Sequence, residues 1–262
     1  MKTERGTCGQ TGAPGAGDGR RDIPILMYHD VVAGPSSLAP FAVTLREFEA
    51  QLDALQRGGW RGVRFQELRE MMAGRAVWDR RCVWITFDDG YASFLELAMP
   101  ALRARGMAAT VFAVAGEMGG FNRWDAPRGF PRRELLGEAG LRAVLDAGME
   151  IGSHGWAHRN LTTCSGAELD EELIRSRESL RERLGADISV FSYPYGRYLP
   201  AHFARLSQAG YEAAVSDRSG EPSVTNNRFA MRRVVIESGQ GGLRFLLRLT
   251  RFYFRYRGWR RS

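Results

Sequence analysis

Short apolar runs alternate with helical patterns about seven times between residues 23 and 240. The runs are long enough for buried strands, and the segments between them repeat apolar residues at helical spacing. Several helical segments close on glycine, which favours the left-handed turn that ends a helix. Strand and helix repeated in this way predict a sheet of parallel strands. We therefore expect a single-domain α/β fold, a distorted (β/α) barrel with about seven parallel strands.

The expected strands cover residues 25–28, 83–87, 109–114, 150–153, 189–192, 212–215 and 234–236. The expected helices cover residues 45–56, 93–105, 138–147, 167–184 and 200–208. Residues 1–21 are rich in glycine and charge and lack apolar periodicity, so we expect them to be disordered. The barrel is expected at residues 22–240, followed by a basic amphipathic helix or tail at residues 241–262.

Composition limits the class of protein. The 262 residues are 44% hydrophobic, which is enough for a core, and no apolar stretch is long enough to predict a transmembrane helix. The first residues lack the apolar segment of a secretory signal peptide. Cys8, Cys82 and Cys164 are odd in number and widely spaced, which is typical of reduced thiols. We therefore expect a cytoplasmic protein.

Two adjacent carboxylates, Asp88 and Asp89, follow the apolar run 83–87 and precede a glycine. Two anions at the end of a buried strand repel each other strongly, because the surrounding dielectric constant is low. A divalent cation removes that cost, and histidine and carboxylate ligands are typical of catalytic zinc sites. The pair therefore predicts one metal ligand and one general base, without indicating which is which.

His154 and His158 lie four positions apart and follow the expected strand 150–153. On a helix such positions share a face, and a turn can also bring two imidazoles to one ion. Their place after a strand puts them at the same end of the barrel as the two aspartates. Two of only four histidines at this spacing favour a metal site over two surface histidines.

Two further segments follow expected strands. In Tyr193-Pro194-Tyr195-Gly196 the proline and glycine favour a tight turn, whose backbone N–H groups could stabilise an oxyanion while the tyrosines contact a sugar. An ordinary turn with two packed aromatic side chains is an equal alternative. The segment 116–131 offers Trp124 and Asp125 for substrate contact, and a surface loop with a packed tryptophan explains it as well.

Three motifs occur in a familiar order and spacing: Thr86-Phe87-Asp88-Asp89-Gly90, His154-x-x-x-His158 and Tyr193-Pro194-Tyr195-Gly196. Together they resemble the polysaccharide deacetylase family, carbohydrate esterase family 4, which shares the nodulation-type chitooligosaccharide deacetylase domain. The resemblance covers about residues 23–240. It implies a distorted (β/α) barrel that removes N-acetyl groups from amino sugars with one divalent metal, usually zinc. The same ligands would also hold cobalt or nickel.

The resemblance also implies roles for individual residues. By position, Asp89, His154 and His158 would bind the metal, and Asp88 would be the catalytic base that removes a proton from water. The backbone N–H of Tyr195 would stabilise the oxyanion.

The acid that protonates the departing amine is not in the family's usual place, because no histidine follows His202. His29 ends the first expected strand in a Tyr-His-x-Val segment, which resembles a family branch with a circularly shifted motif order. We therefore predict that His29 is the acid and that Asp30 is a neighbour that tunes it.

Two positions depart from the family's pattern. The arginine that often lies two residues before the proline of the third motif is replaced by Ser192. Arg233 is the expected substitute, and the adjacent Arg232 is an alternative. The serine or threonine that usually follows the first histidine of the second motif is Gly155, which implies the loss of a supporting hydrogen bond but of no ligand.

The net charge of +7 is local, because residues 243–262 contain seven arginines and no acid. One helical face of this segment carries Arg244, Arg248, Arg251 and Arg255, and leucine and aromatic residues occupy other faces. This pattern suits a helix that lies on anionic lipid, and a final barrel helix with a basic tail is an equal alternative. We predict peripheral contact of residues 243–261 with the inner face of a membrane. We expect no nucleic-acid partner, because the rest of the chain is neutral.

The sequence thus predicts a metal-dependent N-deacetylase that acts on an N-acetylated amino sugar in a polysaccharide, an oligosaccharide or a lipid-linked precursor. Such an enzyme would serve exopolysaccharide or cell-envelope glycan biosynthesis. One alternative is a deformylase of a lipid-linked amino sugar. Another is a catalytically impaired barrel that binds glycan as a scaffold, which the serine at position 192 and the missing C-terminal histidine favour. The intact aspartate and histidine pairs favour the enzyme.

Overall fold

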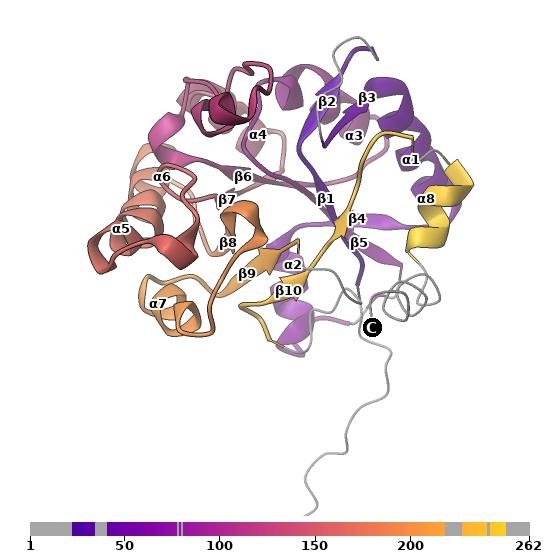
Figure 1. The fold of residues 1–262 in the computed structure, drawn as a ribbon. Coiled ribbons are helices and arrows are strands. Elements are labelled where there is room, and N and C mark those ends of the chain that lie inside the picture. The colour runs from indigo at the N-terminus through magenta and orange to yellow at the C-terminus, as the bar shows by residue number, and fades with distance from the viewer. Residues whose placement is uncertain are drawn as a thin grey trace, which may run out of the picture.

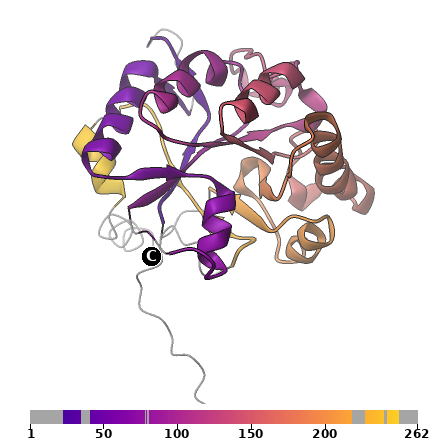
Figure 2. The same ribbon diagram turned by 180° about the vertical axis from the view of Figure 1, so that it is seen from behind.

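In a computed structural model, the described residues are 23–34, 41–77, 79, 81–217, 227–239 and 242–249. Parallel strands form one curved sheet in the middle of the molecule, and helices surround it (Figure 1). The view from behind shows helices outside the strands there too (Figure 2). The predicted α/β barrel is confirmed. The disorder expected for residues 1–21 concerns a segment outside the described residues.

The sheet has nine strands in the order β10-β9-β8-β7-β6-β5-β1-β11, with β4 paired to β5 beside this path. The strands are β1 (Ile25–Tyr28), β4 (Arg61–Val63), β5 (Cys82–Phe87), β6 (Thr110–Ala113), β7 (Glu150–Ser153), β8 (Val190–Ser192), β9 (Ala213–Ser216), β10 (Met231–Arg232) and β11 (Val234–Val235). Every strand expected from the sequence is present, while β4 and β10 were not expected. A separate parallel pair consists of β2 (Asp30–Val32) and β3 (Ala42–Thr44).

One extended segment joins the two ends of this sheet. Its first half, β10, pairs with β9, and its second half, β11, pairs with β1 on the opposite edge. Arg233 lies between the two pairings and is only 3% exposed, whereas the neighbouring Arg232 is exposed. The alternation of an extended chain therefore directs one of the two arginines into the barrel.

Helices cover the outside of the sheet, and their bounds are α1 (Leu45–Arg57), α2 (Phe65–Met72), α3 (Met99–Arg103), α4 (Glu138–Asp146), α5 (Gly166–Asp170), α6 (Ser176–Leu184), α7 (His202–Gln208) and α8 (Gly242–Arg248). The expected helix 93–105 contains a π-helical turn, Phe94–Ala98, before α3. The expected helix 167–184 likewise contains a π-helical turn, Glu171–Arg175, between α5 and α6. Helix α2 was not expected.

The two faces of β5 belong to different parts of the core. Val83, Ile85 and Phe87 pack in the cluster between the sheet and the outer helices. Trp84 packs in a second cluster with Phe65 of α2, at 5.4 Å between ring centroids. Because side chains alternate along a strand, the residue that follows Trp84 and Thr86 on the same face is Asp88.

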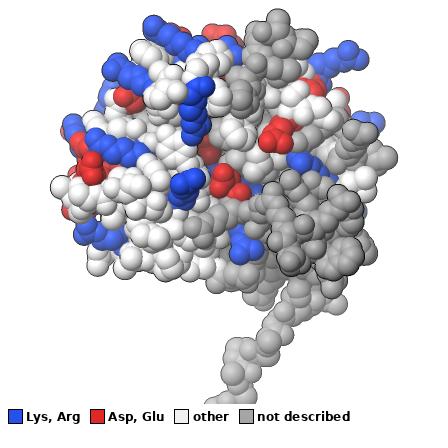
Figure 3. Space-filling model, viewed as in Figure 1, with Lys and Arg blue, Asp and Glu red and all other residues white. Residues whose placement is uncertain are grey.

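Helix α8 is the last described element. It packs against α1, with Phe245 fully buried and Leu247 53% exposed. No helix within the described ranges combines the length and the apolar character that a membrane span requires. Most of the predicted amphipathic helix, from residue 250 onward, lies outside the described residues. Over the face in Figure 3, basic and acidic side chains of the described residues are interspersed.

The start of β7 anchors the start of α2. The Glu150 carboxylate accepts hydrogen bonds from the backbone N–H groups of Phe65 (2.7 Å) and Gln66 (3.1 Å), and from the Thr110 hydroxyl (2.7 Å). These bonds satisfy two N–H groups that a helix N-terminus leaves without intrahelical partners. They lie at the end of β7 opposite to the two predicted metal-binding histidines.

We expect Glu150→Ala to lower the free energy of unfolding by about 1–2 kcal/mol, because partly buried donors lose their acceptor. Urea denaturation measures the change. The exposed Glu182→Ala is the matched control and should stay within about 0.5 kcal/mol of the parent protein. Equal stabilities of the two variants would contradict the anchoring role of Glu150.

Candidate metal centre and active site

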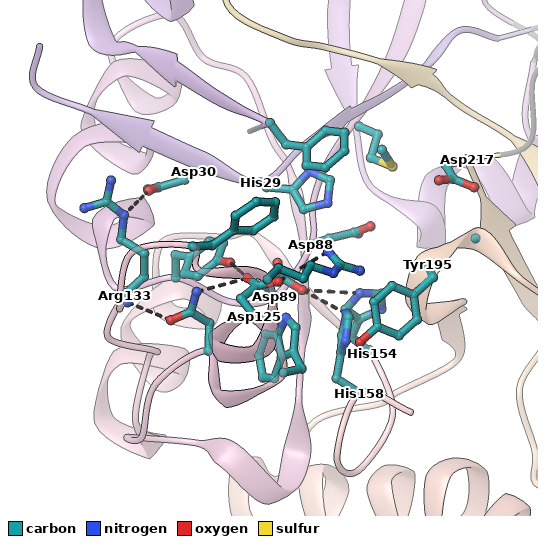
Figure 4. Close-up of a pocket in the computed structure, with 18 of the residues that line it drawn as sticks. His29, Asp30, Asp88, Asp89, Asp125, Arg133, His154, His158, Tyr195 and Asp217 are labelled. Carbon is teal, nitrogen blue, oxygen red and sulfur yellow. Dashed lines mark hydrogen bonds and ion pairs between the residues drawn. The ribbon is translucent and has the colours of Figure 1, made fainter. Parts of the chain in front are cut away.

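A pocket of about 470 Å³ opens where β5, β7 and β8 end. Active sites of parallel barrels lie at these carboxyl ends, and the volume is typical of small-ligand sites. Apart from Pro194, all predicted site residues line the pocket: His29, Asp88, Asp89, Trp124, Asp125, His154, His158, Tyr193, Tyr195, Gly196 and Arg233. Figure 4 shows the central ones converging on one space.

Asp89, His154 and His158 form a buried cluster in this pocket. Their ligand atoms all lie within 4.8 Å of one another. Oδ1 of Asp89 is 3.5 Å from Nε2 of His154 and 3.3 Å from Nε2 of His158 (Figure 4). The structure therefore brings together the three residues that the sequence indicated as metal ligands.

The chemistry of this cluster fits a divalent metal. Among the described residues, the buried Oδ1 of Asp89 receives no hydrogen bond. Nδ1 of His154 lies 2.8 Å from the carbonyl oxygen of Ser192, so it donates there and leaves the Nε2 lone pair directed at Asp89. Burial lowers the pKa of His154 to about 4, which keeps the imidazole neutral, as a metal ligand must be. Two imidazoles and one carboxylate suit zinc, and also cobalt or nickel.

The backbone at the site is in an uncommon conformation. Asp89, His158 and Tyr195 have φ angles of 71°, 56° and 59°, and within the described ranges Phe41 is the remaining non-glycine residue with positive φ. Residues other than glycine rarely adopt this left-handed backbone conformation. The surrounding structure must therefore hold these residues in it. All four of these residues line the same pocket, which indicates that the fold imposes the arrangement of their side chains.

Asp88 is held by an arginine from the seam of the barrel. Nη1 and Nη2 of Arg233 donate to its two carboxylate oxygens at 2.7 and 2.6 Å, and the hydroxyl of Ser192 donates to Oδ2 at 3.2 Å. Burial raises the pKa of Asp88, but the charge and hydrogen bonds of Arg233, together with the nearby histidines, outweigh this effect, and the pKa lies below its usual value. Of the two arginines that the sequence left open, Arg233 makes the contact and Arg232 is exposed.

The Tyr-Pro-Tyr-Gly segment forms a tight turn at the pocket. The Tyr195 ring contacts the His158 ring edge-on, at 4.7 Å between centroids. Tyr193 is buried, and its hydroxyl donates to the carbonyl oxygen of Phe229 at 2.8 Å. A Cβ on Gly196 would lie 1.4 Å from a carboxylate oxygen of Asp217, so only glycine allows this approach.

A loop from residue 121 to residue 135 forms one wall of the pocket. Trp124 stacks on the ring of His158 at 4.4 Å and 20°. Asp125 accepts a hydrogen bond from the amide of Asn122 at 3.0 Å and faces inward (Figure 4). Arg128 lies over the Tyr195 ring at 4.9 Å. Sequence reasoning missed Arg128, because only the folded loop brings it to Tyr195.

His29 reaches the pocket from the end of β1. Its Nδ1 is buried and has no hydrogen-bond partner among the described residues, and its ring stacks on Phe41 at 5.0 Å. The neighbouring Asp30 is engaged elsewhere, with Ser93 at 2.5 Å and Arg133 at 3.0 Å (Figure 4).

Asp217 was not identified from the sequence, yet it lines the same pocket. Burial raises its pKa, while the positive charge of Arg233 opposes the rise. Nothing in the residues around position 217 distinguishes this aspartate from a surface carboxylate.

Comparison with known proteins gives one family. A family model described as polysaccharide deacetylase matches residues 77–214. The matched range contains Asp88, Asp89, His154, His158 and Tyr195, whereas His29 and Arg233 lie outside it.

Two curated relatives are similar in sequence. YxkH of Bacillus subtilis is 28% identical over 223 residues, which are 85% of this chain and 74% of YxkH. The poly-beta-1,6-N-acetyl-D-glucosamine N-deacetylase of Staphylococcus aureus is 23% identical over 207 residues, 75% of this chain and 68% of that enzyme.

Solved structures share the fold. The deacetylase PplD of Streptococcus pyogenes, in complex with acetate, superposes with a TM-score of 0.75 at 23% identity, over 87% of this chain and 98% of PplD. IcaB of Ammonifex degensii superposes with a TM-score of 0.74 at 24% identity, over 88% of this chain and 98% of IcaB.

We expect Asp89→Asn and His154→Ala each to lower zinc affinity by at least about 100-fold, because each removes a ligand of the cluster. Competition with a chromophoric chelator measures the affinity. The fourth histidine provides the control: His202→Asn keeps an acceptor for the Leu199 N–H and should bind zinc like the parent protein. Unchanged affinity in Asp89→Asn would refute this metal site.

Proposed function

Because the chain belongs to the polysaccharide deacetylase family, we propose that it hydrolyses the acetamide of an N-acetylated amino sugar in a polysaccharide, oligosaccharide or lipid-linked glycan precursor. Family membership makes it a hydrolase of carbon–nitrogen bonds other than peptide bonds. The observation that carries the proposal is the carboxylate of Asp88, fixed by Arg233 beside the Asp89, His154 and His158 cluster.

Asp89, His154 and His158 would hold a divalent metal, whose Lewis acidity would make a water molecule more acidic and polarise the acyl oxygen. Asp88 takes the proton of the attacking water. The lowered pKa of Asp88 ensures that it starts as a carboxylate at neutral pH. The two bonds from Arg233 fix both of its oxygens, so the proton acceptor keeps one orientation during the attack.

The remaining roles concern the developing negative charge and the leaving group. We infer that the backbone N–H of Tyr195 donates to the oxyanion, since Pro194 and Gly196 restrict the turn that carries it. His29 would give the proton that the departing amine needs, and its place on the pocket wall supports this role. Trp124 and Asp125 would contact the sugar. The products are acetate and a free amino group.

A glycan-binding barrel without turnover is the less favoured interpretation. Its supports in the sequence are the missing C-terminal histidine and the serine at position 192, where the family often has an arginine. In the structure, Nη2 of Arg233 donates to the Ser192 hydroxyl at 3.0 Å and also binds Asp88. The guanidinium of Arg233 therefore reaches Asp88 from the segment between β10 and β11. The serine at position 192 in place of arginine removes no positive charge from the site.

We expect Asp88→Asn to lower kcat/KM for acetate release by about 10²–10⁴-fold, the usual contribution of a general base, while zinc affinity stays within a few-fold. N-acetylglucosamine oligomers with β-1,6 linkages are the first substrate to assay, given the relative from Staphylococcus aureus. The exposed Asp146→Asn, on the outside of the barrel, is the control.

Two other outcomes are informative. Release of formate but not acetate from a lipid-linked amino sugar would favour the deformylase. Zinc binding without release of any acyl group from a panel of amino sugars would favour the binding barrel.

We also propose that residues 243–261 contact an anionic membrane surface. The support is the run of seven arginines without an acid among leucine and aromatic residues. The cytoplasmic location stays a prediction.

We expect deletion of residues 250–262 to weaken binding to vesicles that contain anionic lipid at least tenfold, because each basic residue near such a surface contributes about 1 kcal/mol. Cosedimentation measures the binding, and neutral phosphatidylcholine vesicles are the control. Deacetylation of a soluble oligosaccharide should be unchanged. Equal cosedimentation of the full and shortened chains would rule out the membrane contact.

A further inference from the structure

A buried carboxylate with no part in the mechanism above lies behind the metal centre. Glu172, in the π-helical turn between α5 and α6, has an exposed fraction of 0%. Its oxygens accept hydrogen bonds from the backbone N–H groups of Trp156 (2.9 Å), Ala157 (2.9 Å) and Arg159 (3.4 Å). These donors belong to the loop that carries His158, and two of them flank that histidine directly.

Gly155 makes room for this carboxylate. It has a φ of 85°, and a Cβ there would lie 2.3 Å from Oε2 of Glu172. Position 155 is where the family resemblance leads one to expect serine or threonine. In this chain the space of that side chain is filled by Glu172, which accepts hydrogen bonds from the loop.

The turn that carries Glu172 is itself fixed to the end of β7. The hydroxyl of Ser176 donates to the carbonyl oxygen of Glu172 at 2.5 Å and lies 3.0 Å from the hydroxyl of Ser153. Ser153 also accepts the N–H of Gly155 at 3.2 Å. The carboxylate therefore has a defined position relative to the strand that leads into the two histidines.

The two histidines are oriented in different ways. His154 has the usual second contact of a metal-binding imidazole, from Nδ1 to a carbonyl oxygen. Nδ1 of His158 is buried and has no such partner among the described residues. Its ring is bounded by aromatic contacts, and its backbone is in the left-handed region. Without such a hydrogen bond, the orientation of His158 depends on these ring contacts and on how its backbone is held.

We propose that Glu172 is a positioning residue of the metal centre, whose carboxylate holds residues 155–159 so that His158 faces Asp89. The inference rests on the proposed metal ligands and adds a residue that contacts neither metal nor substrate. Three backbone donors converge on one carboxylate, an arrangement that stabilises a single loop conformation. Relaxing it would let His158 leave its strained backbone conformation.

The decisive variant is Glu172→Gln, which keeps the size of the side chain. Its NH₂ group cannot accept, so a donor would face a donor at Trp156 or Ala157. We expect zinc affinity to fall about 10–100-fold, as is typical when a group that orients a ligand is lost. The visible spectrum of the cobalt-substituted protein should change, and excess zinc should restore most of kcat.

Glu171→Gln is the matched control. Glu171 lies in the same π-helical turn and forms an ion pair with Arg159 at 2.6 Å; the corresponding distance from Glu172 is 3.8 Å. Within the described residues, however, Glu171 accepts no hydrogen bond from a backbone N–H of residues 155–159. A second variant, Gly155→Ser, disturbs the loop while keeping the buried charge. It should weaken zinc binding too, although it introduces the residue that the family pattern favours.

The outcomes separate the inference from the proposed metal site. Thermal unfolding of the metal-free proteins reports any purely structural role of Glu172. If Glu172→Gln and Gly155→Ser unfold earlier but bind zinc as tightly as Glu171→Gln, the positioning role is wrong. If the parent protein binds neither zinc nor cobalt, the metal site itself is wrong, and the inference fails with it.

Discussion

The buried ion pair between Arg233 and Asp88 joins the closure of the barrel to the chemistry of the pocket. Arg233 lies where one extended segment passes from its pairing with β9 to its pairing with β1, and its guanidinium is buried inside the barrel. Loss of either partner would leave an isolated charge, which typically costs about 3–5 kcal/mol. Thr86 and Ser192 accept hydrogen bonds from Nη1 and Nη2 of the same guanidinium, while its buried Nε has no partner among the described residues. The closure of the fold and the orientation of the proposed base thus depend on one interaction.

Much of the sheet could be predicted because buried parallel strands have continuous apolar sequences. The run 83–87 is the clearest example, and all seven expected strands are present. Strands β4 and β10 were missed because they are only three and two residues long, and each contains an exposed arginine, Arg61 or Arg232. The π-helical turns were missed as well, since an inserted residue hardly alters the apolar pattern of a long helix.

Some residues of the candidate site could be predicted from the sequence and others could not. Asp88, Asp89 and His154 could be predicted because they directly follow strands, and His158 because it lies four positions after His154. Glu172 could not be predicted. In the acidic run Glu168 to Glu172 it resembles a solvent-facing helix residue, and nothing local distinguishes it from Glu171. Its burial depends on a loop sixteen residues earlier and on the missing side chain of Gly155. Such pairings are properties of the packed structure rather than of any motif.

The late position of the barrel seam has a consequence for biosynthesis. Ribosomes release a chain from its N-terminus, and domains acquire structure in that order. Asp89, His154 and His158 emerge well before the segment 231–235, so a nascent chain contains every ligand of the cluster while Asp88 still lacks its guanidinium. Loading with an ion can then precede competence for hydrolysis. The last of the described strands to be made is the one that completes the proposed site, and a product cut short of it would retain the proposed ligands without an oriented base.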